Sequence, residues 1–367
     1  MKNILFSLLA ALGLMGCLLS CQQKDPNAST DDVVYVGSEN RKLYAVDAAT
    51  GTKKWEFPTG APVFGSPVVS NGLVYVGSGD KKFYALDATT GAKKWDFTTG
   101  SFVDSSPVVS NGIVYVGSYD KKLYALDATA GTKKWDFTTG DYIPGSPVVS
   151  NGLVYVGSVD KKLYALDAAI GTKKWDFTTG ARIDSSPMVS NGIVYVGSSD
   201  KKLYALDAIS GAKKWDFTTG SDVSSSPMVS DGIVYVGSGD KKLYALDAGS
   251  GAKKWDFTTG GRIDSSPTVS NGLVYIGSAD GKLYALDAAT GTKKWDLSVS
   301  GSKNISSPTV SNGVLYLNGD PTKLYAVDAA TGTGKWSFFT GGSNAETQSS
   351  PCVVTKTGAV VHWGNRN

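Results

Sequence analysis

Short runs of β-branched and aromatic residues return at regular intervals along the chain from residue 33 onward. The unit at residues 106–140 shows the pattern, with turn-forming residues such as Asn111-Gly112 between the runs. Its four runs cover residues 106–110, 112–118, 122–127 and 133–138. No part of the repeat has an apolar period of 3.6 residues that is long enough for a helix. Each unit is therefore predicted to form four short β-strands.

A tryptophan near the end of each unit marks the period. These residues are Trp55, Trp95, Trp135, Trp175, Trp215, Trp255, Trp295 and Trp336, so the spacing is 40 residues and then 41 at the last step. Residues 111–140 and 191–220 differ at only four of thirty positions. Four strands in a unit of about 40 residues are typical of a β-propeller blade. The sequence predicts an all-β, eight-bladed propeller of four-stranded antiparallel blades, formed as one domain by residues 33–367.

The two ends of the repeat region are predicted to close the ring. Residues 33–60 supply only the second, third and fourth strands of a blade, and residues 350–354 match the missing first strand. Pairing these segments would remove an exposed sheet edge. A further run at 358–364 resembles a second strand. It either lies outside as an extra strand or displaces the strand at 33–37.

The first 20 residues are predicted to be a lipoprotein signal peptide. Lys2 precedes the apolar stretch at 4–15, and two short runs then end in Cys17 and Cys21. Both runs resemble the lipobox of bacterial lipoproteins. Cys21 is favoured as the lipidated residue, with Cys17 as the alternative, because a polar tether at 21–32 begins there. An ordinary cleaved secretory signal is the other interpretation.

This leader predicts a place in the bacterial cell envelope. Gln22 after the lipidated cysteine implies sorting to the outer membrane, facing the periplasm, with the cell surface as the alternative.

Composition excludes several function classes. The formal charge is only +3, from 36 basic and 33 acidic residues, which argues against a nucleic-acid binder. The one histidine, His362, argues against a histidine-based triad or zinc site. Cys352 is the only cysteine after the leader, so no disulfide framework can form.

The run Ala-x-Asp-x-x-Thr-Gly-x-x-x-Trp at residues 45–55 resembles the tryptophan-docking motif of the pyrroloquinoline-quinone (PQQ) repeat family. It returns at 285–295 and at 326–336, where Gly334 replaces a lysine. The resemblance covers residues 33–355 and implies a propeller in which the tryptophans dock neighbouring blades. The family includes quinoprotein dehydrogenases and also the non-enzymatic propeller lipoprotein of the outer-membrane barrel-assembly machine, which this chain resembles most in character.

The sequence favours a protein without catalytic residues, cofactor or metal. A quinoprotein dehydrogenase would need a catalytic aspartate, calcium ligands and stacking groups, whereas glutamate occurs here only at 39, 56 and 346. Asp104, Asp184 and Asp264 recur at every second blade. Calcium ligands must all lie about 2.3–2.6 Å from the ion, so aspartates two blades apart are not expected to share one. Neither PQQ nor calcium is supported by the residues present.

Differences between the repeats predict a binding face. They are concentrated between the tryptophan strand and the next Ser-Pro, and at one position of the turn between the second and third strands. In an up-and-down blade these two connections emerge on the same face, and variation there suggests recognition. The candidate residues are Phe64, Phe102, Asp104, Tyr119, Tyr142, Arg182, Asp184, Asp222, Arg262 and Asp264. Neutral drift in exposed loops is the alternative, since the turns on the opposite face also vary.

These observations lead to a predicted scaffold. The leading hypothesis is a monomeric, lipid-anchored envelope propeller that binds other envelope proteins, in outer-membrane protein assembly, and binds no nucleic acid. The first alternative is a propeller that binds carbohydrates or other ligands at several equivalent sites. The second is a protein resembling a PQQ-dependent dehydrogenase.

Overall fold

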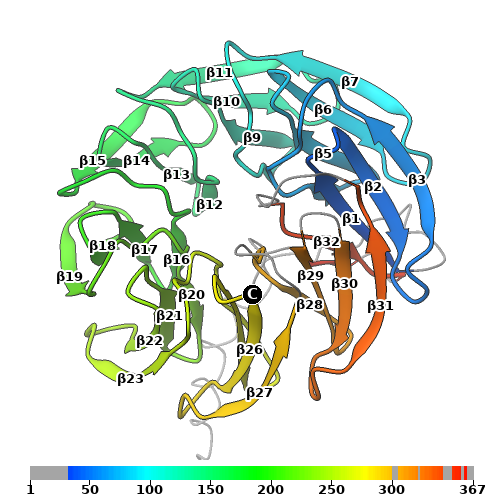
Figure 1. Cartoon of the computed structure of the whole chain (residues 1–367). Helices are drawn as coiled ribbons and strands as arrows, with labels where there is room; N and C mark the ends of the chain where they lie inside the picture. Colours follow the sequence, from blue (N-terminus) through cyan, green and yellow to red (C-terminus); the bar gives the residue numbers. More distant parts are fainter. Residues whose placement is uncertain (1–31, 300–304, 321–322, 342–348, 357–358, 362–367) are drawn as a thin grey trace, which may run out of the picture.

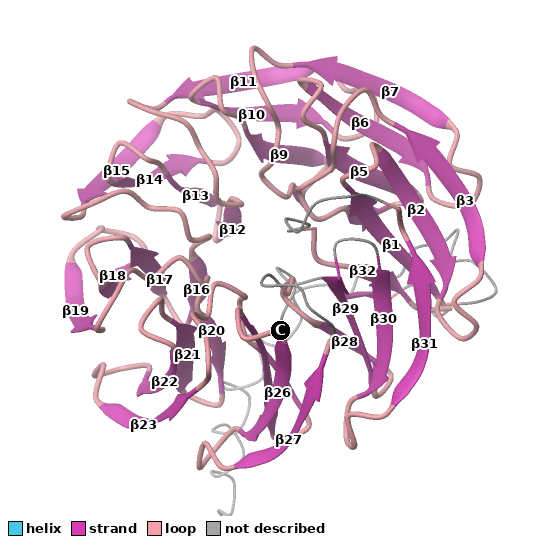
Figure 2. Ribbon diagram, in the orientation of Figure 1, coloured by secondary structure: helices cyan, strands magenta, loops and turns pink. Residues whose placement is uncertain are grey.

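In the part of the chain whose structure is described, strands alone form the regular structure (Figure 2). The computed structural model describes residues 32–299, 305–320, 323–341, 349–356 and 359–361. The predicted signal peptide, both leader cysteines, most of the tether and His362 lie outside these residues. The described part holds no helix that could span a membrane.

Seven four-stranded sheets and one five-stranded sheet radiate from a common centre (Figure 1). Blade 1 contains β1 (Val33–Ser38), β2 (Lys42–Asp47), β3 (Lys53–Pro58), β32 (Cys352–Val354) and β33 (Val360–Val361). Blade 2 contains β4 (Val68–Ser70), β5 (Leu73–Gly77), β6 (Lys82–Asp87) and β7 (Lys93–Thr98). Blade 3 contains β8 (Val108–Ser110), β9 (Ile113–Gly117), β10 (Lys122–Asp127) and β11 (Lys133–Thr138). Blade 4 contains β12 (Val148–Ser150), β13 (Leu153–Gly157), β14 (Lys162–Asp167) and β15 (Lys173–Thr178).

The other four blades repeat this order. Blade 5 contains β16 (Met188–Ser190), β17 (Ile193–Ser198), β18 (Lys202–Asp207) and β19 (Lys213–Thr218). Blade 6 contains β20 (Met228–Ser230), β21 (Ile233–Gly237), β22 (Lys242–Asp247) and β23 (Lys253–Thr258). Blade 7 contains β24 (Thr268–Ser270), β25 (Leu273–Ser278), β26 (Lys282–Asp287) and β27 (Lys293–Ser298). Blade 8 contains β28 (Thr309–Ser311), β29 (Val314–Asp320), β30 (Lys323–Asp328) and β31 (Gly334–Phe339). The predicted eight-bladed propeller is confirmed.

The innermost strand of each blade is shorter than the sequence pattern predicts. In blade 3 the run begins at Ser106, but β8 begins at Val108. Pro107 has no N–H to give to a sheet, and the Ser106 N–H donates instead to Ser146 Oγ of the next blade, at 3.1 Å. The same serine-to-serine bond links most neighbouring blades, so the Ser-Pro sequences form a ring of hydrogen bonds around the centre.

Both chain ends contribute to blade 1, as predicted. β32 pairs antiparallel with β1, with Val353 opposite Val34, and β32 also contacts the inner strands β28 and β4 on either side. The extra run at the C-terminus does not displace β1. It forms β33, which pairs with the free edge of β32 and becomes the strand nearest the centre in a five-stranded sheet.

The tryptophan-docking motif joins each blade to the next. Between blades 3 and 4, the Ala168 carbonyl accepts hydrogen bonds from the Tyr115 hydroxyl at 2.9 Å and from Trp135 Nε1 at 3.1 Å. Gly171 lies against the indole, and a Cβ at this position would be only 2.6 Å from Trp135 Cδ2. Asp167 Oδ1 accepts the backbone N–H groups of the same turn. These contacts give the motif residues structural partners between neighbouring blades.

Candidate functional site

The predicted binding face is built from two sets of connections that lie together. In blade 3, the backbone N–H of Tyr119 in the β9–β10 turn donates to the carbonyl of Phe102 in the β7–β8 loop, at 2.9 Å. The equivalent bond joins Val159 to Tyr142 at 3.1 Å and recurs in other blades. The geometric prediction that these loops and turns share one face is therefore confirmed.

The six inter-blade loops before blades 2 to 7 are each held at the third residue. Ile143 is fully buried, and its N–H donates to the Ser118 carbonyl of blade 3 at 3.3 Å. A Cβ on Gly117 would lie 2.4 Å from Ile143 Cγ2, so glycine at that point gives the side chain its room. Val103 and Ile183 are buried in the same way. Because the third residue points inward, the second and fourth residues are left at the surface.

Three of the predicted residues form a continuous group of rings, which we call the aromatic sector: Phe102, Tyr119 and Tyr142. The ring centroids of Tyr119 and Tyr142 are 4.6 Å apart, and those of Phe102 and Tyr119 are 6.2 Å apart. Phe102 is 47% exposed. Phe64, in the loop before blade 2, is half-buried and makes no ring contact with them among the described residues.

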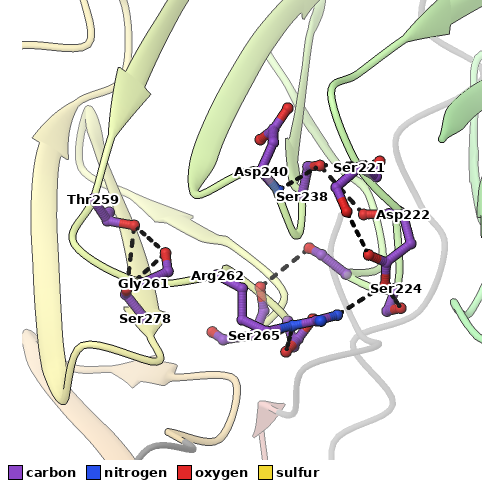
Figure 3. Close-up of polar contacts among 12 residues, drawn as sticks. Ser221, Asp222, Ser224, Ser238, Asp240, Thr259, Gly261, Arg262, Ser265 and Ser278 are labelled. Carbon is purple, nitrogen blue, oxygen red and sulfur yellow. Dashed lines mark hydrogen bonds and ion pairs between the residues drawn. The ribbon is translucent and has the colours of Figure 1, made fainter.

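Five further predicted residues, which we call the charged sector, are arranged as ion pairs: Arg182, Asp184, Asp222, Arg262 and Asp264. Arg182 Nε lies 2.8 Å from Asp184 Oδ2 within one loop. Arg262 Nε lies 2.6 Å from Asp264 Oδ2, and its Nη2 reaches Asp222 Oδ2 of the neighbouring loop at 2.8 Å (Figure 3). Burial alone would raise the pKa of Asp222, but hydrogen bonds from Ser221 and the charge of Arg262 bring that pKa below its ordinary value.

Asp104 differs from the other acidic residues of the face. It forms no ion pair within the described ranges, and its Oδ1 is buried there without a hydrogen-bond partner. Burial raises the pKa of Asp104, and the nearby Tyr119 hydroxyl only partly opposes this rise. Burial also raises the pKa of Tyr119, and the charges of Asp104 and Asp184 add to that effect.

No metal centre is formed by these aspartates. Among the residues with described positions, no group of three or more His, Cys, Asp or Glu side chains could hold a metal ion. Asp184 and Asp264 are each paired with the arginine of their own loop. The absence of a metal or quinone cofactor stays a prediction.

Comparison with known proteins agrees with this architecture. A family model described as outer membrane protein assembly factor BamB matches residues 22–102, 96–221, 175–262 and 256–366, which is almost the whole chain. The chain belongs to the BamB family. No curated protein sequence gives a significant match.

Solved structures of this shape include a BamB and a designed protein. BamB from Moraxella catarrhalis is 21% identical, with a TM-score of 0.67, over 84% of this chain and 92% of that one. The computationally designed Ika8 protein is 17% identical, with a TM-score of 0.71, over 85% of this chain and 98% of that one. At these identities the likeness shows the fold alone.

Sequence reasoning proposed ten candidate binding residues in this BamB-family chain, and their part in binding stays a prediction. It treated ten positions as one face, whereas the structure separates an aromatic sector over blades 3 and 4 from a charged sector over blades 5 to 7. It also did not identify that Asp104 lacks the arginine partner that Asp184 and Asp264 have. A signal for this was present, because Phe102 stands where Arg182 and Arg262 precede their aspartates.

Proposed function

We propose that this chain is a non-catalytic, lipid-anchored envelope propeller that binds another protein through the aromatic sector and acts in outer-membrane protein assembly. The family match over residues 22–366 carries the proposal. The aromatic sector supports a protein partner, because tyrosine and phenylalanine are enriched at the cores of protein–protein interfaces. The loops that carry it are bonded to the turns of the blades beneath, so the surface is preorganised.

The acidic side chains support a non-catalytic role, since the repeated ones already have structural partners. In blade 3, Asp136 lies between Lys122 and Lys133, at 3.0 and 2.5 Å. Asp120 Oδ2 accepts the Gly100 N–H of the preceding blade at 2.6 Å and the Tyr124 hydroxyl at 2.7 Å. Carboxylates held in this way are poorly placed to act on a substrate.

A multivalent carbohydrate binder would need equivalent sites in several blades. Among the described loops and turns, the three contacting rings of the aromatic sector occur together once. The surface therefore favours one partner on one side of the ring.

The anchor is tested by Cys21→Ala. If Cys21 carries the lipid, this variant is expected to leave the membrane fraction and appear in the soluble envelope fraction, because a protein without acyl chains loses its main membrane affinity. Fractionation with immunodetection measures this, and Cys17→Ala is the matched control. Loss of membrane association in Cys17→Ala alone would assign the lipid to Cys17 instead.

The partner surface is tested by replacing its three rings together. Phe102→Ser, Tyr119→Ser and Tyr142→Ser in one chain should abolish co-purification of a stoichiometric envelope protein from native membranes. Folding should persist, because Ser199 already occupies the position equivalent to Tyr119 in blade 5.

The matched control removes three residues of the charged sector, with Arg182→Ser, Asp222→Ser and Arg262→Ser. This variant is expected to retain the partner. If the charged-sector control loses the partner and the triple serine variant of the aromatic sector keeps it, the aromatic sector is not the docking surface.

A further inference from the structure

Three loops of the binding face share a four-residue pattern, which we call the frame: its third residue is buried and its fourth is an aspartate. Two read Ala-Arg-Ile-Asp at 181–184 and Gly-Arg-Ile-Asp at 261–264, and the third reads Ser-Phe-Val-Asp at 101–104. The third residue of each is fully buried, so the frame holds the second and fourth residues in the same relation. The three loops can therefore be compared position by position.

In two of these loops the aspartate forms an ion pair with the arginine of the same loop. Arg182 Nε lies 2.8 Å from Asp184, and Arg262 Nε lies 2.6 Å from Asp264, with the Arg262 Nη2 donating to the same carboxylate at 2.9 Å. The frame thus places a guanidinium beside the fourth residue. A two-bond contact of this kind suits the planar fork of arginine.

In the third loop the guanidinium is missing. Phe102 occupies the arginine position, and Asp104 has no cationic partner among the described residues. Leaving a largely buried carboxylate oxygen without a partner is unfavourable. The Tyr119 hydroxyl hydrogen-bonds to Asp104, but Oδ1 has no partner in the described part of the chain. The site therefore favours a cation with hydrogen-bond donors.

Aromatic rings stand in place of the arginine, and they favour the binding of such a cation. The rings of Phe102, Tyr119 and Tyr142 lie side by side next to Asp104. Aromatic faces attract guanidinium groups, which stack on them while keeping their edges free for hydrogen bonds. Other charged groups also lie near this point. Asp184 acts on the Tyr119 hydroxyl, and Asp141, next to Tyr142 in the chain, pairs with Lys121 at 3.6 Å.

We propose that Asp104 and the aromatic sector form a receptor for one arginine side chain of the partner protein. The guanidinium would stack on the rings and pair with the Asp104 carboxylate, in the role that Arg182 and Arg262 have in their own loops. Asp104 is only partly buried as a residue, and rotation about its terminal torsion exchanges its two oxygens, so the carboxylate can meet an incoming donor. This inference rests on the proposed function and specifies the chemistry of the same site.

The test uses a small probe in place of the partner. The full-length protein, labelled with ¹⁵N, is titrated with Nα-acetyl-arginine amide and, separately, with Nα-acetyl-citrulline amide, a neutral analogue of the same shape. The arginine probe is expected to shift the amide resonances of residues 101–104, 119 and 141–144 with saturable, millimolar affinity. The citrulline probe is expected to bind at least about tenfold more weakly, because it lacks the charge.

Two variants make the result specific. Phe102→Arg should abolish the amide shifts caused by the probe, because the new side chain places its own guanidinium beside Asp104. The variant should fold, because arginine already occupies the equivalent positions 182 and 262. Asp104→Asn should also abolish the shifts, whereas Asp184→Asn should not. If the arginine probe gives no saturable shifts at 101–104, or gives the same shifts in Phe102→Arg, the inference is wrong.

The inference and the proposed function can fail separately. If the arginine probe does not bind the unmodified protein and the partner still co-purifies with Phe102→Arg, the arginine receptor is excluded while the scaffold role stands. If the probe binds as expected but the variant without the three rings loses no partner, the site binds a guanidinium, but neither the docking surface nor its use for the partner's arginine holds.

Discussion

A chain that ends at Ser349 is expected to lose much of its stability and to aggregate. Removing 350–367 deletes β32 and β33, and with them the fully buried Cys352 and Val353 and the nearly buried Val354. Burying three such side chains is worth about 5 kcal/mol in total. The loss would also break the bonds from Thr309 Oγ1 to the Pro351 carbonyl and from Ser350 N to Ser66 Oγ.

The exposed edge of β1 adds a second consequence. Without β32, the backbone groups of Val33 to Tyr35 lose their partners on that side, which leaves an apolar edge open to other chains. Urea unfolding and light scattering measure the two effects. A chain that ends at Val361 keeps both strands and serves as the control. Equal unfolding midpoints for the two truncated chains would show that the C-terminal strands do not close the ring.

The second large effect is expected at a glycine of the docking motif. Gly171 has a φ of 75° and lies against the indole of Trp135, where a new Cβ would be 2.6 Å from Cδ2. Gly171→Ala is expected to cost roughly 3 kcal/mol, about 1 from the left-handed backbone and the rest from displacing the indole. The displaced indole would also weaken its bond to the Ala168 carbonyl.

Gly152 provides a matched control in the same blade. Its φ is also 75°, but no atom lies within 4 Å of the position that a Cβ would take. Gly152→Ala should therefore show only the backbone cost, roughly 1 kcal/mol. Chemical denaturation of both variants gives the difference. Equal destabilisation would mean that the contact between glycine and indole contributes little to blade docking.

The fold could be predicted from the sequence because one unit is repeated almost unchanged. The tryptophan period and the two turn glycines of each unit determine the blade, and the incomplete first unit requires a strand from the other end. The place of β33 could not be predicted, because its sequence resembles that of β1. Only the structure shows which edge of β32 remains free for it.

The site was less predictable, because the grouping of its residues depends on which side chains are long enough to contact the loop of a neighbouring blade. Arg262 spans to Asp222 in the preceding loop. At the loop before Arg182 the equivalent residue is Tyr142, which turns instead toward Tyr119. The difference between Asp222 and Tyr142 is therefore one of those that separate the charged sector from the aromatic one. Spacing along the chain is the same in both cases and cannot distinguish them.

Some contacts between blades also had no clear signal in the pattern of apolar residues. The serine ring, and in blades 2 to 7 the aspartate of the turn between the second and third strands, bind backbone N–H groups of a neighbouring blade. They are visible in the sequence only as recurring polar residues of the repeat. Their roles follow from geometry, since an N–H that leaves a sheet needs an acceptor nearby.

The proposed docking surface is tested most directly by site-specific photo-crosslinking in native membranes. One crosslinking residue replaces Tyr142 in the aromatic sector, and a second replaces Ala130, which is exposed in the turn between β10 and β11. We expect one discrete protein adduct from position 142 and none from position 130. An adduct from position 130 with none from 142 would contradict it.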